Sequence, residues 1–370
     1  MRRRVVLACL AAPALLLWAA GADAADFWGL KAGNLQLKSA GSLAFGPEGI
    51  LFVGDQQAAT VFAIDTSDNS GEPAQAKFNI DGLNKKIAET LGTSVQNIEI
   101  NDLAANPLSG NLYLSVTDQQ SKQPSIVQLK TTGEMARLPL KNVRFSKAEL
   151  ADAPEDKVSG EGRRRRNPRA ESITDLAFID GRVLISGLSS ASDASTVREL
   201  QFPFAEVNPG TSIEIYHGAH GRYEANSPVR AFVPFMIGNE PNLLAGFTCT
   251  PLVKFPLSDL KPGTKVRGTT MAELGNRNRP LDMIVYEKGG KTYLLLSNSA
   301  RGVMKISTDD IERDAGITER VGGGGTAGQK YETIADLKGV TQLAKLNDTQ
   351  AVILVQDESG SQNLETIPLP

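Results

Sequence analysis

The sequence contains 370 residues with a formal net charge of −3 at pH 7, and 41% of its residues are hydrophobic. This nearly neutral, slightly acidic balance gives no indication of nucleic acid or an anionic membrane as a general partner. A chain of this length exceeds the usual size of one compact domain, unless it grows by adding repeated units that each carry a small core.

The first 24 residues have the three parts of a signal peptide. Arg2 to Arg4 form a basic start, Val5 to Trp18 an apolar stretch, and Ala22 to Ala24 a small-residue cleavage site. We expect cleavage after Ala24 and a periplasmic or secreted protein, with an uncleaved anchor as the alternative. Both the general and the twin-arginine export routes remain open. The rest of the chain has no other long apolar run, so no membrane span is expected after cleavage.

The rest of the chain repeats one unit about six times. Residues 43–65 and 103–129 show it most clearly: each reads as strand, turn, strand, polar loop and strand, and Asp-Gln-Gln recurs at Asp55 and Asp118. Radial repeats of short strands are typical of β-propeller blades. The predicted innermost strands lie at 42–45, 102–105, 175–178, 228–235, 282–285 and 342–345.

These repeats predict an all-β fold in which residues 25–370 form one six-bladed propeller of four-stranded antiparallel blades. The sixth blade reaches the end of the sequence after three strands, so we expect Leu30 to Ser39 to supply its outer strand and close the ring. The blade pattern resembles six-bladed propellers of the NHL, SMP-30 and TolB-like kind over nearly the whole mature chain. We identify no closer family, and we expect a monomer.

The two histidines of the chain, His217 and His220, lie three residues apart in a glycine-containing turn before the fourth blade. Cys249, the single cysteine left after cleavage, lies in the neighbouring loop, so no intramolecular disulfide is expected. Two imidazoles and a thiolate are typical ligands for zinc or copper. The alternative is a pair of surface histidines beside an inert buried cysteine.

Three aspartates, Asp102, Asp175 and Asp282, occupy the same position of three inner strands. Carboxylates around one channel are suited to calcium, and Asn101 and Asn278 offer further oxygen ligands. The resemblance to SMP-30-like lactonases implies a channel metal of this kind. However, Ser42 stands where those enzymes have a glutamate. The alternative is that each aspartate caps backbone N–H groups of the adjacent blade.

Arginines also approach this face, and guanidinium groups suit carboxylate or phosphate ligands. The candidates for ligand binding are Arg169, Arg230, Arg279 and Arg301; the alternative is pairing with Glu171 and the channel aspartates. A basic run at Arg163 to Arg166 lies in a long polar linker that either docks an acidic partner, covers the channel or is simply solvated. The glycine-rich segment 321–328 is expected to be a flexible connection on the opposite face.

Two functions remain open at this point. The first is a non-catalytic propeller that binds a small ligand, a metal or a protein partner on its channel face. The second is a metal-dependent hydrolase with one divalent ion (calcium, zinc or copper). We favour the binding protein, because the sequence lacks a recognisable catalytic signature such as Gly-x-Ser-x-Gly. Neither the ligand nor the presence of an ion follows from the sequence.

Overall fold

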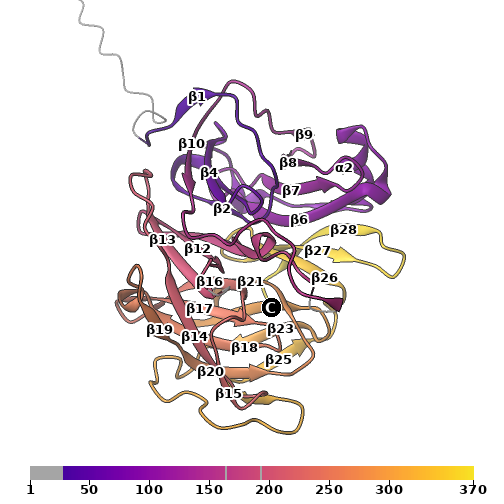
Figure 1. Cartoon of the computed structure of the whole chain (residues 1–370). Helices are drawn as coiled ribbons and strands as arrows, with labels where there is room; N and C mark the ends of the chain where they lie inside the picture. Colours follow the sequence, from indigo (N-terminus) through magenta and orange to yellow (C-terminus); the bar gives the residue numbers. More distant parts are fainter. Residues whose placement is uncertain (1–27, 163–164, 192–193) are drawn as a thin grey trace, which may run out of the picture.

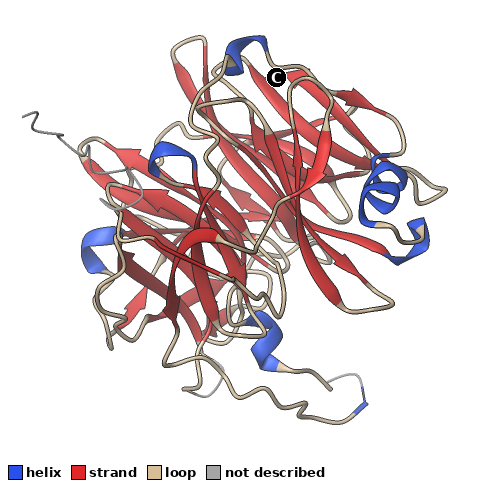
Figure 2. Cartoon of the chain, turned by 90° about the horizontal axis from the view of Figure 1, so that it is seen from above, coloured by secondary structure: helices blue, strands red, loops and turns tan. Residues whose placement is uncertain are grey.

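The computed structural model describes residues 28–162, 165–191 and 194–370, so the predicted signal peptide, Arg163 and Arg164 lie outside it. The described chain forms six antiparallel sheets arranged as the blades of a propeller, as predicted. Figure 2 shows the strands filling the ring and the short helices lying at its margins. Within the described part of the chain, no helix is long and apolar enough to cross a membrane.

Blades are numbered here by the chain order of their innermost strands. Blade one contains, from the channel outwards, β2 (Leu43–Phe45), β3 (Ile50–Asp55), β4 (Thr60–Asp65), β10 (Val143–Glu149) and β1 (Lys31–Gly33). Blade two contains β6 (Ile98–Ala105), β7 (Leu112–Asp118), β8 (Gln123–Leu129) and β9 (Met135–Arg137). Blade three contains β11 (Asp175–Ile179), β12 (Arg182–Leu188), β13 (Ser195–Gln201) and β14 (Thr211–His217), which extends to β15 (Arg222–Glu224) and β19 (Lys265–Arg267).

The remaining blades follow in the same way. Blade four contains β16 (Val229–Ile237), β17 (Glu240–Phe247), β18 (Pro251–Pro256), β20 (Thr269–Leu274) and β24 (Thr326–Gly328). Blade five contains β21 (Pro280–Lys288), β22 (Lys291–Asn298), β23 (Gly302–Ser307) and β25 (Tyr331–Ile334). Blade six contains β26 (Val340–Lys345), β27 (Gln350–Gln356), β28 (Gln362–Pro368) and β5 (Asn79–Ile80).

The order of the blades around the ring differs from their order in the chain. Six apolar clusters each join two blades, and together they give the ring order one, three, four, five, six, two and back to one. Blade one therefore lies between blades two and three. In Figure 1 the yellow strands β27 and β28 accordingly lie beside purple blade two.

The strand that completes blade six is not the one predicted. The expected segment, Leu30 to Ser39, contributes β1, which pairs with β10 at the outer edge of blade one. Blade six is completed instead by β5, whose Ile80 pairs with Leu364. The physical reason is packing, because Leu30 and Leu35 are buried against blades one, two and three rather than against blade six.

Blades one and six are thus composite. Blade one takes its fourth strand, β10, from the segment after blade two, and blade six takes β5 from the segment before blade two. The junction at blade six is reinforced by Phe78, whose backbone N–H donates to Thr366 Oγ1 at 2.8 Å and whose carbonyl accepts from the Thr366 N–H at 2.9 Å. β10 covers the edge of β4, and β5 covers the edge of β28, so neither edge is left unpaired.

Helix α2 (Leu83–Leu91) covers the seam between blades two and six. Leu83 and Ile87 lie four residues apart, which places them on one face, and both are fully buried in the shared cluster. The helix ends at Gly92, whose φ of 71° is a left-handed conformation that favours glycine. Single-turn helices lie elsewhere at η1 (Pro47–Gly49), η2 (Pro73–Gln75), η3 (Val95–Asn97), η5 (Pro168–Glu171) and η6 (Leu257–Asp259).

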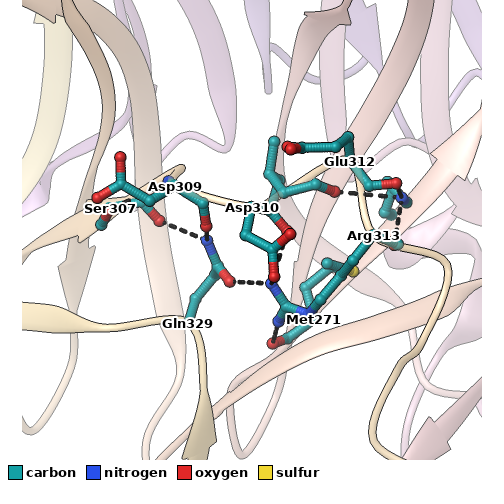
Figure 3. Close-up of polar contacts among 9 residues, drawn as sticks. Met271, Ser307, Asp309, Asp310, Glu312, Arg313 and Gln329 are labelled. Atoms are coloured by element: carbon teal, nitrogen blue, oxygen red, sulfur yellow. Dashed lines mark hydrogen bonds and ion pairs between the residues drawn. The ribbon is translucent and has the colours of Figure 1, made fainter.

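A long excursion, residues 308–330, crosses the outside of blade four before the chain returns to blade five. Its start is held by the buried ammonium of Lys254, which donates to the carbonyl oxygens of residues 311–313 at 2.8–3.1 Å. Figure 3 shows Arg313 of this segment reaching the carbonyl of Met271 and the side chain of Gln329. Burial lowers the pKa of Lys254, and the three carbonyl acceptors offset that desolvation.

The same excursion carries the glycine-rich segment to a place that the sequence did not predict. Val321 N–H donates to the Gly218 carbonyl at 2.9 Å, and Asn276 N–H donates to the Gly324 carbonyl at 3.0 Å. The expectation that this segment lies on the face opposite the histidines was therefore wrong. It packs directly against the histidine turn, because small residues let two backbones approach.

We predict that Phe78→Ala will lower the free energy of unfolding by about 3–5 kcal/mol, since it leaves a cavity where the closing segment joins blade six. Phe78 is 3% exposed. Met236→Ala is the matched control, because Met236 is 49% exposed and its loss should change stability by less than about 0.5 kcal/mol. Chemical denaturation followed by fluorescence measures both. Equal stability of the two variants would contradict the composite closure.

Candidate metal centre and channel

The histidine turn joins β14 to β15. Residues His217 and Arg222 pair across the hairpin, and the Gly221 N–H donates to the His217 carbonyl at 2.8 Å. Gly221 adopts a φ of +67°, which glycine tolerates without strain. The hairpin places the two imidazoles against each other, with ring centroids 3.9 Å apart. His217 is buried, whereas the side chain of His220 is 44% exposed.

Glu224 holds both rings in place. Its Oε2 lies 2.8 Å from His217 Nδ1, and its Oε1 lies 2.8 Å from His220 Nδ1. Burial by itself raises the pKa of Glu224, but the hydrogen bonds from His217, His220 and Arg222 outweigh it and lower this pKa to about 2. An ionised carboxylate favours a proton on each Nδ1, which leaves the Nε2 lone pairs free to bind.

His217 Nε2 is buried and has no hydrogen-bond partner among the described residues. Burial also lowers the pKa of His217, so its ring is neutral near pH 7. A buried imidazole nitrogen without a partner costs free energy unless something binds it. This acceptor is the feature of the turn that is suited to binding a ligand.

Cys249 enters the same space from the loop between β17 and β18. One ring nitrogen of each histidine and the Cys249 Sγ all lie within 4.8 Å of one another. Among the described residues, this is the one group of three or more His, Cys, Asp or Glu side chains placed to hold an ion. The structure therefore brings together the three residues that the sequence proposed as soft-metal ligands.

The backbone around the cysteine is strained. Cys249 and Thr250 adopt φ values of 63° and 61°, which are uncommon for residues other than glycine and unfavourable for a β-branched one. Hydrogen bonds hold this turn: Cys249 N–H donates to the Asn278 carbonyl at 2.8 Å, and Thr250 Oγ1 donates to the Gly275 carbonyl at 2.7 Å. Strain that the surrounding structure maintains is characteristic of functional positions.

A second carboxylate, Glu273, lies under the histidine turn. Its Oε1 accepts the Gly218 N–H, and its Oε2 is buried without a partner among the described residues. Burial raises the pKa of Glu273 to about 7, although hydrogen bonds from Gly218 and Ala219 oppose the rise. Glu273 thus positions the backbone between the two histidines.

The sequence analysis missed both glutamates. Glu224 stands four residues after His220 within the same short segment, so the spacing contained a signal. Glu273 lies 55 residues from Gly218 in the chain, and no local pattern connects them.

The three channel aspartates connect neighbouring blades. Each carboxylate accepts the N–H of the residue that follows it and, through Oδ2, an N–H of the next blade. The second set of contacts joins Asp102 to Leu43 at 2.6 Å, Asp175 to Phe232 at 2.7 Å and Asp282 to Leu343 at 2.6 Å. This is the alternative role that the sequence analysis left open, and a shared ion at these aspartates stays a prediction.

Burial dominates the ionisation of these carboxyls. It raises the pKa of Asp102 to about 7 and, together with repulsion from Asp102, that of Asp175 to about 8. The pKa of Asp282 is also raised well above its usual value by burial and by the other two aspartates. The backbone N–H donors oppose these shifts without cancelling them.

The mouth of the channel forms a cavity of about 550 Å³ to which all six blades contribute wall residues. Of the four candidate arginines, Arg230 and Arg279 line it. Arg169 Nε donates instead to the Pro154 carbonyl at 2.6 Å, and Arg301 Nη2 donates to the Asn276 carbonyl at 3.3 Å. The structure brings together two of the four.

No known protein family matches the chain, and no curated protein matches it by sequence. Among solved structures, the plexin A4 extracellular region shares 11% identity and a TM-score of 0.44 over 90% of this chain and 39% of its own. A putative oxidoreductase (glucose dehydrogenase) of Thermus thermophilus shares 13% identity and a TM-score of 0.35 over 92% of this chain and 100% of its own. The PQQ-bound aldose sugar dehydrogenase of Streptomyces coelicolor shares 11% identity and a TM-score of 0.31 over 91% and 97%.

The chain spans about two fifths of the plexin chain that it resembles. These likenesses are too distant to carry an argument about function. The assignment of a six-bladed propeller depends instead on the strand pairing described above.

We predict that the raised pKa values make the channel sensitive to pH. A carboxyl whose pKa rises from 3.8 to about 8 on folding, as in Asp175, contributes most stability below pH 3.8, and this contribution is lost as the pH rises through about 8. Asp175→Asn removes the titration and one N–H acceptor. It should cost about 1–3 kcal/mol at pH 5 and flatten the decline of stability between pH 4 and 8. Denaturation at several pH values tests this, and a variant as steep as wild type would contradict it.

Proposed function

We propose that this chain is an exported propeller, periplasmic or secreted, that binds one zinc or copper ion through His217, His220 and Cys249. The single observation that carries the proposal is the buried, unpartnered Nε2 of His217 beside a second imidazole and a thiol. Two nitrogens and a sulfur suit zinc or copper rather than calcium, which requires oxygen ligands.

The surroundings support the same assignment. Glu224 accepts from both Nδ1 atoms, which is the usual arrangement of a carboxylate behind metal-binding histidines. Glu273 and the Asn278 carbonyl fix the two loops from which the ligands project. These contacts pre-organise the ligand atoms and reduce the cost of binding.

A metal-dependent hydrolase is the second candidate, and one observation favours it. Three protein ligands leave a fourth position of a tetrahedral ion open, and the exposure of His220 gives water access to it. An ion held by these three residues would supply the chemistry of a metal-bound water with a lowered pKa. Metal-loaded protein that hydrolyses an ester or lactone, and loses this activity in Cys249→Ser, would favour the enzyme over the binding protein.

We predict that the protein purified without chelator contains close to one equivalent of zinc or copper by elemental analysis. Cys249→Ser and His220→Ala should each lose most of that ion, because two remaining protein ligands hold it poorly. Asp282→Asn is the control and should retain the ion, since the Asp282 carboxylate accepts backbone N–H groups of Met283 and Leu343 and lies outside the histidine group. Loss of metal from Asp282→Asn alone would place the ion in the channel instead.

Glu224→Gln tests the role of the carboxylate behind the ligands. We expect the affinity for zinc or copper to fall about 10- to 100-fold while the stoichiometry at saturation stays the same, because an amide orients the rings poorly and lacks the charge. Competition with a chromogenic chelator measures the affinity. Glu214→Gln is the matched control and should leave the affinity unchanged, because Glu214 lies in the adjacent strand β14 and pairs with Lys265 and Arg267. Equal affinity in both variants would remove Glu224 from the site.

A further inference from the structure

Arg279 is an exposed residue in the wall of the channel mouth. The backbone N–H of Arg279 donates to Ser299 Oγ at 3.0 Å, which fixes the start of the side chain. Its guanidinium makes no hydrogen bond or ion pair within the described ranges. Partial desolvation lowers the pKa of Arg279, the neighbouring Arg230 lowers it further, and Glu171 opposes both effects. Among the described residues, no carboxylate pairs directly with this guanidinium, although Glu99 and Glu171 line the same wall.

The neighbouring arginine is already engaged. Arg230 Nη1 lies 2.8 Å from Glu171 Oε1, and Arg230 Nε donates to Thr248 Oγ1 at 3.1 Å. Glu171 also lies 3.7 Å from Arg166. These contacts engage Glu171, whose charge acts on Arg279, and leave the Arg279 guanidinium available to a ligand.

A second unsatisfied group lines the same cavity. Gln56 Oε1 is buried and has no partner in the described part of the chain. A Cβ added at Gly41 would lie 2.6 Å from this atom, so the glycine makes room for the amide. The amide of Gln56 offers both a donor and an acceptor to a bound molecule.

We propose that the channel mouth binds a small organic monocarboxylate, with Arg279 as the anchor of the carboxylate and Gln56 as a second polar contact. The guanidinium fork matches a carboxylate in a bidentate manner. A cavity of about 550 Å³ is within the usual size of small-molecule sites. Glu99 and Glu171 also line the wall and disfavour anions with more than one charge.

The site is separate from the metal centre, since none of the three metal ligands lines the cavity. The proposed carboxylate site does not depend on metal binding at the histidines. Metal-stripped protein therefore serves for the test, and a failure of either proposal leaves the other standing.

The experiment is isothermal titration with pyruvate, lactate, benzoate, citrate and inorganic phosphate. We expect saturable binding of at least one of the three monocarboxylates, with citrate and phosphate weaker. Arg279→Gln should weaken that binding roughly 10- to 100-fold, since it removes a charged hydrogen-bond donor, and Arg279→Lys should restore only part of it. Arg277→Gln is the matched control, because Arg277 is exposed like Arg279 and lies two residues away, but is outside the cavity wall.

The wall itself is tested by Gly41→Ala, which keeps Arg279 and displaces Gln56. We expect Gly41→Ala to bind the monocarboxylate more weakly. The melting temperatures of the Gly41 and Arg279 variants should match that of wild type, which checks that they are folded. The proposal is overturned if wild type binds none of the monocarboxylates, if Arg279→Gln binds like wild type, or if citrate or phosphate binds most tightly. Unchanged affinity in Gly41→Ala would remove Gln56 from the site.

Discussion

The ring depends on a hydrogen bond between a channel aspartate and the backbone of the next blade. Asp102, Asp175 and Asp282 lie in blades two, three and five, which alternate around the ring only because blade one lies between blades two and three. The contacts join two to one, three to four and five to six, all in the same direction. The propeller is therefore built from three pairs of blades, each pair fastened at the channel by one carboxylate. Apolar clusters fill every interface between blades, and apolar packing by itself does not define one orientation. The aspartate hydrogen bonds require a particular geometry and so define how the two blades of a pair are placed.

The composite blades make this ring one cooperative unit. Blade one and blade six each borrow an outer strand, β10 and β5, from segments next to blade two. Unfolding of the segment before blade two would expose the outer edge of blade six, which is otherwise built from the C-terminal end of the chain. The burial of Phe78 at the rim and the aspartate contacts at the channel thus both stabilise the folded ring against unfolding.

The candidate metal centre and the channel cavity share one loop. Thr248 accepts a hydrogen bond from Arg230 in the cavity wall, and the next residue, Cys249, faces the two histidines. The left-handed backbone conformations of Cys249 and Thr250 turn the chain here, so that the side chain of Thr248 faces the cavity wall and that of Cys249 faces the histidines. The glycine-rich segment closes over the histidine turn from outside and completes the packing of this corner.

The sequence by itself determined the three inner strands of each blade, the number of blades and the proximity of His217 to His220, because each depends on residues close together in the chain. Alternating and apolar runs specify a strand wherever it lies, and a spacing of three within a turn keeps two rings together. The repeated position of Asp102, Asp175 and Asp282 also indicated, as one of two alternatives, that these carboxylates accept hydrogen bonds from the adjacent blade. Which strand closes each blade was decided only by the tertiary structure. β1 and β5 have three and two residues, which is too short for any periodic signal, and their partners are set by the burial of Leu30, Leu35 and Phe78. The same holds for the surroundings of Cys249, Glu273 and Arg279, because their neighbours come from other loops and other blades.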